Sequence, residues 1–188
     1  MRLFIAIELS QSIRDELARI QFHLKYSAAD VKWVEKDNIH LTLKFLGEVP
    51  EEKVEKIKSI LDGTAKEMKS FDISLKDIGA FPKIEYPRVI WVGLDKGVVE
   101  SKGLAEKIDE ELSKIGYEKE PRPFAAHLTI GRVRSAKNKA ALKEKISSIT
   151  PIPGSQLVTS ITLFKSTLTS NGPIYTKLHE AKLYCNKA

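Results

Sequence analysis

A short stretch that occurs twice constrains the fold of this chain more than any other feature. The first copy begins at His40 and reads HLTLKFLG, and the second begins at His127 and reads HLTIGR. In both copies polar and apolar residues alternate, and a threonine follows the histidine two positions later. Residues i and i+2 of a β-strand point to the same face, so the leucines between them point to the other face. The pattern predicts two core strands that each present an imidazole and a hydroxyl on their outer face.

Apolar spacing predicts strands and helices over the remainder of the chain. Residues 3–7 form a continuous apolar run typical of a buried strand, and the apolar residues of 11–25 recur at helical spacing. Besides the two motif strands, further strands are predicted over 31–34, 71–75, 89–94, 157–168 and 174–184. Further helices are predicted over 50–68, over a segment that ends near residue 116, and over 137–149. The proline-containing segments 83–88 and 120–123 are predicted to be loops.

The two histidines are 87 residues apart, and other elements repeat at the same interval. A shift of 87 residues places 2–7 on 89–94, with Phe4 on Trp91, and also places helix on helix twice. We interpret this as the duplication of a β-α-β-α-β unit, with halves at about 1–87 and 88–188. The predicted fold class is α+β, with two pseudo-symmetric lobes of mostly antiparallel sheet flanked by helices. The whole chain, 1–188, would form a single bilobal domain with the active-site cleft between the lobes.

Composition narrows the class of protein and its surroundings. The chain has 31 Lys and Arg against 25 Asp and Glu, a net charge of +6 that suits a polyanionic partner such as RNA. It has one cysteine, which excludes an internal disulfide and a cysteine-based zinc site and indicates a reducing compartment. The N-terminal apolar run is too short for a signal peptide, and no long apolar run follows. We therefore expect a cytoplasmic protein that does not contact a membrane, and a monomer by default.

The residue types of the two motifs suit phosphodiester chemistry. Two histidines can supply one neutral base and one protonated acid near neutral pH, which are needed to activate a nucleophile and to protonate a leaving oxygen. Thr42 and Thr129 can donate hydrogen bonds to non-bridging phosphate oxygens. Arg132 follows the second motif and can add a permanent positive charge. None of these steps needs a metal. Zinc binding by the same histidines is the rival chemistry, but no adjacent carboxylate or cysteine completes a ligand set.

These motifs carry a resemblance to a known family that extends over nearly the whole chain. Its residues are the opening 2–7, Trp33, the first motif 40–47, the segments 88–91 and 124–132, and the closing Gly172 and Tyr175. The chain resembles the two-histidine (2H) phosphoesterases, in particular the prokaryotic RNA 2',3'-cyclic phosphodiesterases that are also described as 2'-5' RNA ligases (LigT-like). One residue departs from the family pattern: Ala126 stands before the second histidine, where proline is common. This change removes no chemical group.

The resemblance implies an enzyme that opens the 2',3'-cyclic phosphate at an RNA 3' end and leaves a 2'-phosphate, without a metal or nucleotide cofactor. It implies that His40 donates the proton to the leaving oxygen, that His127 activates water, and that Thr42 and Thr129 bind the phosphate. The partner would be RNA with cyclic phosphate ends, for which tRNA fragments are one candidate. The reverse reaction would join RNA ends through a 2'-5' linkage.

Two further interpretations remain open at this stage. Phe45 lies three residues after Thr42, so on an even strand it faces away from the histidine and is expected in the core; the alternative is a substrate-binding role as a base-stacking platform. The whole protein could also be a non-catalytic module that binds RNA ends or nucleotides. The remaining histidines, His23 and His179, have no matching partner in the sequence and are expected to be structural.

Overall fold

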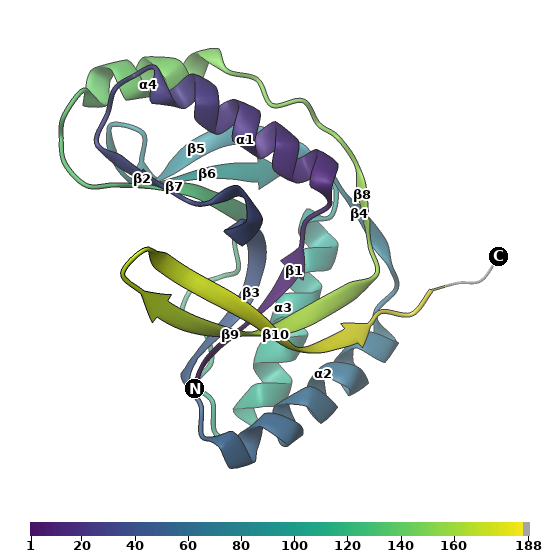
Figure 1. Cartoon of the computed structure of the whole chain (residues 1–188). Coiled ribbons are helices and arrows are strands. Elements are labelled where there is room, and N and C mark those ends of the chain that lie inside the picture. The colour runs from purple at the N-terminus through teal and green to yellow at the C-terminus, as the bar shows by residue number, and fades with distance from the viewer. Residues whose placement is uncertain (186–188) are drawn as a thin grey trace.

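The helices and strands follow the apolar spacing of the sequence in the computed structural model, which describes residues 1–185 (Figure 1). The strands are β1 (Arg2–Glu8), β2 (Val31–Trp33), β3 (His40–Glu48), β4 (Phe71–Ile73), β5 (Leu75–Lys83), β6 (Tyr86–Leu94), β7 (His127–Val133), β8 (Gln156–Val158), β9 (Ser160–Thr169) and β10 (Gly172–Lys182). The helices are α1 (Gln11–Lys25), α2 (Val54–Glu67), α3 (Val98–Ser113) and α4 (Lys139–Ser148), with short 3-10 turns at Lys36–Asn38 and Glu51–Lys53.

Two antiparallel sheets of four strands form the framework, and the predicted α+β class is confirmed. In sheet A the strand order is β10-β9-β1-β3, and in sheet B it is β2-β7-β6-β5. The short strands β4 and β8 pair separately. Helices α2 and α3 pack on sheet A, whereas α1 and α4 lie side by side along sheet B (Figure 1). One continuous cluster of buried apolar side chains connects these layers, and its burial is the main favourable term in folding. No helix among the described residues is long and apolar enough to cross a membrane.

The sheets do not follow the two halves of the sequence. Strand β1 pairs with β3 from its own half and with β9 from the second half. In the equivalent place, β6 pairs with β7 from its own half and with β5, which precedes residue 88. Each half therefore contributes one strand to the sheet of the other half. The duplication itself stays a prediction, but neither sheet could form from one half alone.

Three expectations about the strands need correction. The predicted loop at 83–88 is wrong, because β5 runs to Lys83 and β6 begins at Tyr86, so these residues form a hairpin. Its prolines are tolerated because Pro82 lies on the edge strand β5, and Pro87 precedes the residues of β6 that pair with β7. The predicted strand 157–168 is interrupted between β8 and β9, and the predicted strand 71–75 is interrupted between β4 and β5. In both places the chain leaves the small β4-β8 sheet for one of the large sheets.

A buried lysine ties strand β3 to helix α3. Lys44 is 4% exposed, and its Nζ contacts the Asp109 carboxylate and donates a hydrogen bond to the Glu118 carbonyl oxygen at 2.9 Å. Burying a charge is costly unless it is paired, so Asp109 is the residue that makes this position of Lys44 possible.

Removal of one partner of this pair should destabilise the protein strongly. Asp109→Ala should lower the free energy of unfolding by about 3–5 kcal/mol, because it leaves a buried charge uncompensated. The double variant Lys44→Met, Asp109→Leu should recover most of that loss, since it removes both charges. Urea denaturation measures both effects. Glu67→Ala, which breaks the more exposed pair with Lys107, serves as a control and should cost less than about 1 kcal/mol. An equal loss in the single and double variants would contradict this account.

Candidate functional site

The two motif strands have the alternation that the sequence predicts. Leu41 and Leu128 are fully buried, whereas His40, His127 and the two threonines are partly exposed. Strand β3 lies at one edge of sheet A and contacts β7 of sheet B, so the two motifs belong to neighbouring strands of different sheets.

Both histidine rings are held by the same bond to the chain. Nδ1 of His40 lies 2.8 Å from the carbonyl oxygen of Asn38, and Nδ1 of His127 lies 2.6 Å from that of Ala125. A carbonyl oxygen can only accept, so in each ring Nδ1 carries the hydrogen and donates it. In a neutral ring Nε2 is then the free acceptor, the atom that can take up or deliver a proton. The matching carbonyl groups are 87 residues apart, like the histidines themselves.

A matching β-bulge follows each threonine. The pairing of β3 with β1 skips Leu43, and the pairing of β7 with β6 skips Ile130, 87 residues later. An extra residue on one strand reverses the alternation of the residues after it. As a result, Phe45 and Arg132, each three residues after its threonine, are exposed on their strands.

The expectation that Phe45 belongs to the core is wrong. Its side chain is 64% exposed, and its ring lies 6.1 Å from the ring of Phe4. Phe4 in turn stacks on His40, so Phe45 lies on the same face of sheet A as the histidine. The physical reason is the bulge at Leu43, which strict alternation along the strand does not reveal.

Aromatic side chains surround His40. Its ring stacks on Phe4 at 4.8 Å between centroids and meets the edge of Tyr175 at 5.4 Å. Phe164 and Tyr175 pack against Phe4 in a small apolar cluster on this face of sheet A. Phe81 meets the His127 ring edge-on at 5.0 Å.

Burial lowers the pKa of His40 from 6.5 to about 4. The hydrogen bond to the Asn38 carbonyl opposes this shift, and the positive charge of Arg14 adds to it. In the empty site His40 is therefore neutral at pH 7. Burial also raises the pKa of the Tyr175 hydroxyl, and the nearby positive charges of Arg132 and Arg2 act in the opposite direction. This effect places Arg132 of sheet B within electrostatic range of Tyr175, beside His40.

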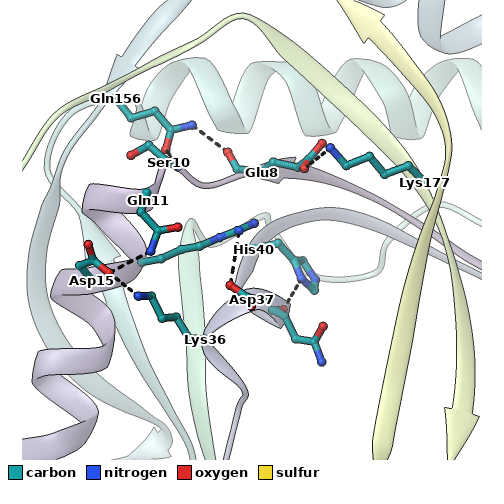
Figure 2. A network of polar contacts seen from close by, with 11 residues as sticks. Glu8, Ser10, Gln11, Asp15, Lys36, Asp37, His40, Gln156 and Lys177 are labelled. Carbon is teal, nitrogen blue, oxygen red and sulfur yellow. Dashed lines mark hydrogen bonds and ion pairs between the residues drawn. The ribbon is translucent and has the colours of Figure 1, made fainter.

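A cavity of about 360 Å³ opens beside His40. Its lining includes Glu8, Arg14, Asp37, His40, Tyr175 and Lys177, most of which Figure 2 labels. Two ion pairs border it: Lys177 Nζ lies 2.6 Å from Glu8 Oε2, and Arg14 Nη1 lies 3.8 Å from Asp37 Oδ1. The described residues that line this cavity do not include Thr42, His127 or Thr129.

The structure thus joins some of the predicted residues directly and others only through their strands. His40 and Phe45 share one aromatic cluster, and Arg132 acts on it from sheet B. His127 and Thr129 lie on the adjacent strand β7. Sequence reasoning about the chemistry missed Arg14, because a single arginine at the edge of the apolar stripe of α1 looks like an ordinary surface residue. It also assigned no role to Tyr175, although this residue forms part of the resemblance.

Among residues 1–185, no group of three or more His, Cys, Asp or Glu side chains is placed to hold a metal ion. His179 pairs instead with one carboxylate, Asp62 Oδ1, at 2.7 Å from its Nε2, and joins β10 to α2.

Comparisons with known proteins decide the family. The model of the LigT like phosphoesterase family matches residues 7–91 and 97–175. The chain belongs to this family. An RNA 2',3'-cyclic phosphodiesterase of Methanocaldococcus jannaschii is 44% identical over 182 residues, which cover 96% of this chain and 99% of the relative. The LigT-like fold is also found in a Thermus thermophilus protein, which matches with a TM-score of 0.84 at 26% identity and covers 99% of this chain and all of its own. Escherichia coli LigT in complex with 3'-AMP matches with a TM-score of 0.74 at 31% identity and covers 97% and 96% of the two chains.

The low pKa of His40 should make the stability of the protein depend on pH. Between about pH 4 and 6.5 the unfolded state binds a proton at this histidine and the folded state does not, so acid favours unfolding. Relative to His40→Gln, the wild-type protein should lose about 3 kcal/mol of unfolding free energy as the pH falls from 7 to 4. Urea denaturation at several pH values measures this difference. Parallel curves for the two proteins would show that His40 is not buried as described.

Proposed function

We propose that this chain is an RNA 2',3'-cyclic phosphodiesterase, which hydrolyses the cyclic phosphate at an RNA 3' end to a 2'-phosphomonoester. The observation that carries the proposal is the pair of HLT strands with matching ring orientation, in a chain that aligns almost end to end with relatives of that name. Escherichia coli LigT has been crystallised with 3'-AMP, which supports a nucleotide at this face.

In the proposed reaction both histidines act through Nε2 on one phosphorus atom. His127 takes a proton from water, and the water oxygen forms a new bond to phosphorus. The bond between phosphorus and O3' breaks, and His40 delivers its proton to that oxygen. The product keeps the phosphate on O2'. Acid and base groups in such positions typically contribute about 10² to 10⁴ in rate.

The donor role of His40 requires a change of its charge state on binding. A pKa of about 4 leaves the ring neutral in the empty site. The negative charge of a bound cyclic phosphate favours the imidazolium form, and each unit of pKa that it restores corresponds to about 1.4 kcal/mol of attraction. Substrate binding would thus bring the proton into the site that uses it.

The other predicted site residues have supporting roles in this proposal. Thr42 and Thr129 donate hydrogen bonds to the non-bridging oxygens, where charge grows in the transition state. Arg132 adds a permanent positive charge from sheet B. Phe45 is an exposed aromatic ring on the face that carries His40, where a base of the RNA can stack on it.

Further parts of the proposal concern the setting of the reaction. A site that catalyses hydrolysis also catalyses its reverse, so 2'-5' joining of RNA ends is expected at high RNA concentration. We expect the enzyme to work as a cytoplasmic monomer, without a metal or other cofactor, on RNA fragments such as tRNA halves.

Product analysis tests the proposed activity. RNA ending in a 2',3'-cyclic phosphate should be converted to RNA ending in a 2'-phosphate, with no loss of rate in EDTA. His40→Ala and His127→Ala should each lower kcat by about 10² or more while leaving the fold intact. Thr42→Val and Thr129→Val should lower kcat by about 10², as expected for the loss of one charge-stabilising donor. Chromatography of the RNA and circular dichroism of the variants are the measurements.

The same assay separates the enzyme from a binding module. A module would bind cyclic phosphate RNA in a salt-sensitive way and return it unchanged after prolonged incubation. Abolition of turnover by EDTA, or a near-normal rate in either alanine variant, would contradict the two-histidine mechanism.

Titration of His40 tests its assignment as proton donor. In the free protein its ring should titrate near pH 4, and with a nucleoside 2'-phosphate bound the pKa should rise by more than one unit, because the anion stabilises the imidazolium. Nuclear magnetic resonance of histidine side chains, assigned with His40→Gln, gives both values. An unchanged pKa in the complex would leave His40 neutral during turnover, and the donor and acceptor roles would have to be exchanged.

A further inference from the structure

An arginine with unused hydrogen-bond donors lines the cavity beside His40. Arg14 lies on α1, next to Ile13 of the buried stripe, and its side chain is only 21% exposed. Its Nε is buried and has no hydrogen-bond partner among residues 1–185. A buried polar group without a partner is rare in folded proteins and indicates an absent ligand or water. The guanidinium group is well suited to phosphate, which it can bind through two parallel hydrogen bonds.

The neighbouring carboxylates do not satisfy this arginine. Asp37 is 86% exposed, and its Oδ1 lies 3.8 Å from Nη1 of Arg14, an exposed pair that contributes little stability. Glu8 is already bound by other groups, since Oε2 contacts Lys177 Nζ at 2.6 Å and Oε1 accepts from the Thr162 hydroxyl at 2.8 Å (Figure 2). An anion can therefore displace Asp37 from Arg14 at small cost, whereas Glu8 stays with Lys177.

The position of Arg14 distinguishes it from the groups proposed to hold the reacting phosphate. The cavity reaches His40 from the side of Asp37 and Arg14, and its described lining contains neither threonine of the two motifs. The positive charge of Arg14 is nevertheless felt at His40. An anion on Arg14 would thus lie close to the reacting phosphate without coinciding with it.

We propose that Arg14 forms a second phosphate subsite, which binds the phosphodiester that joins the terminal nucleotide to the rest of the RNA. This inference rests on the proposed function, because an RNA end carries such a phosphodiester one nucleotide from its cyclic phosphate. A nucleoside 2',3'-cyclic phosphate has no second phosphate. Arg14 therefore makes the site selective for RNA ends over free cyclic nucleotides. The two carboxylates in the cavity leave little net charge for a lone phosphate, so the subsite works on a ligand that is already held at His40.

Binding of two product analogues tests the subsite without any need for turnover. Adenosine 2'-phosphate carries only the phosphate that the reaction leaves, and adenosine 2',5'-bisphosphate carries a second phosphate at the chain side. Calorimetry on the wild-type protein should give a Kd about tenfold lower for the bisphosphate, the usual effect of one charge-assisted contact. In Arg14→Met this ratio should fall to near one, and Arg14→Lys should retain part of it because the charge remains.

The matched control is Arg19→Met on the same helix. Arg19 pairs with Glu16 at 2.6 Å and is absent from the cavity lining, so its removal should leave the tenfold ratio intact. A wild-type ratio near one, or an unchanged ratio in Arg14→Met, would overturn the subsite. Hydrolysis of a cyclic phosphate dinucleotide is assayed in parallel on the wild-type protein. Loss of the proposed activity alone would leave the binding ratio as an independent test of Arg14.

Discussion

The hydrogen bond between Nδ1 of each motif histidine and the carbonyl group two residues earlier is the contact on which the chemistry of this site depends. At 2.8 Å for His40 and 2.6 Å for His127, it fixes both the rotation of the ring and the nitrogen that carries the hydrogen. Because the acceptor belongs to the strand entry itself, the ring is oriented by the backbone rather than by a neighbouring side chain. The same local geometry is repeated on two strands of two different sheets, which contact each other.

The duplicated frame carries unlike side chains at equivalent places, and this difference can assign unlike roles to the two histidines. The bulges at Leu43 and Ile130 turn Phe45 towards the face of one histidine and give an exposed Arg132 after the other motif. His40 is enclosed by aromatic rings and has a low pKa, which makes its protonation sensitive to an incoming anion. Exchange of strands between the sheets joins the two halves tightly, so the relative position of the motifs is set by the common core.

Local pattern was enough to predict the elements that carry the site, and the rest depended on contacts distant in sequence. The alternation after His40 and His127 and the helical spacing over 11–25 match β3, β7 and α1. The prolines near 83–88 suggested a loop because the sequence does not show that β5 is an edge strand, where Pro82 is tolerated. The reversal of Phe45 needs the pairing register with β1, and the position of Arg14 needs the packing of α1 beside the first motif.

The central claim is that both imidazoles act on one phosphate, and a crystal structure with a bound nucleoside 2'-phosphate tests it most directly. The account predicts that Nε2 of His40 and Nε2 of His127 both lie within about 3 Å of oxygens on the same phosphate, with the threonine hydroxyls on its remaining oxygens. A phosphate bound by one histidine alone, with the other ring turned to solvent, would contradict it.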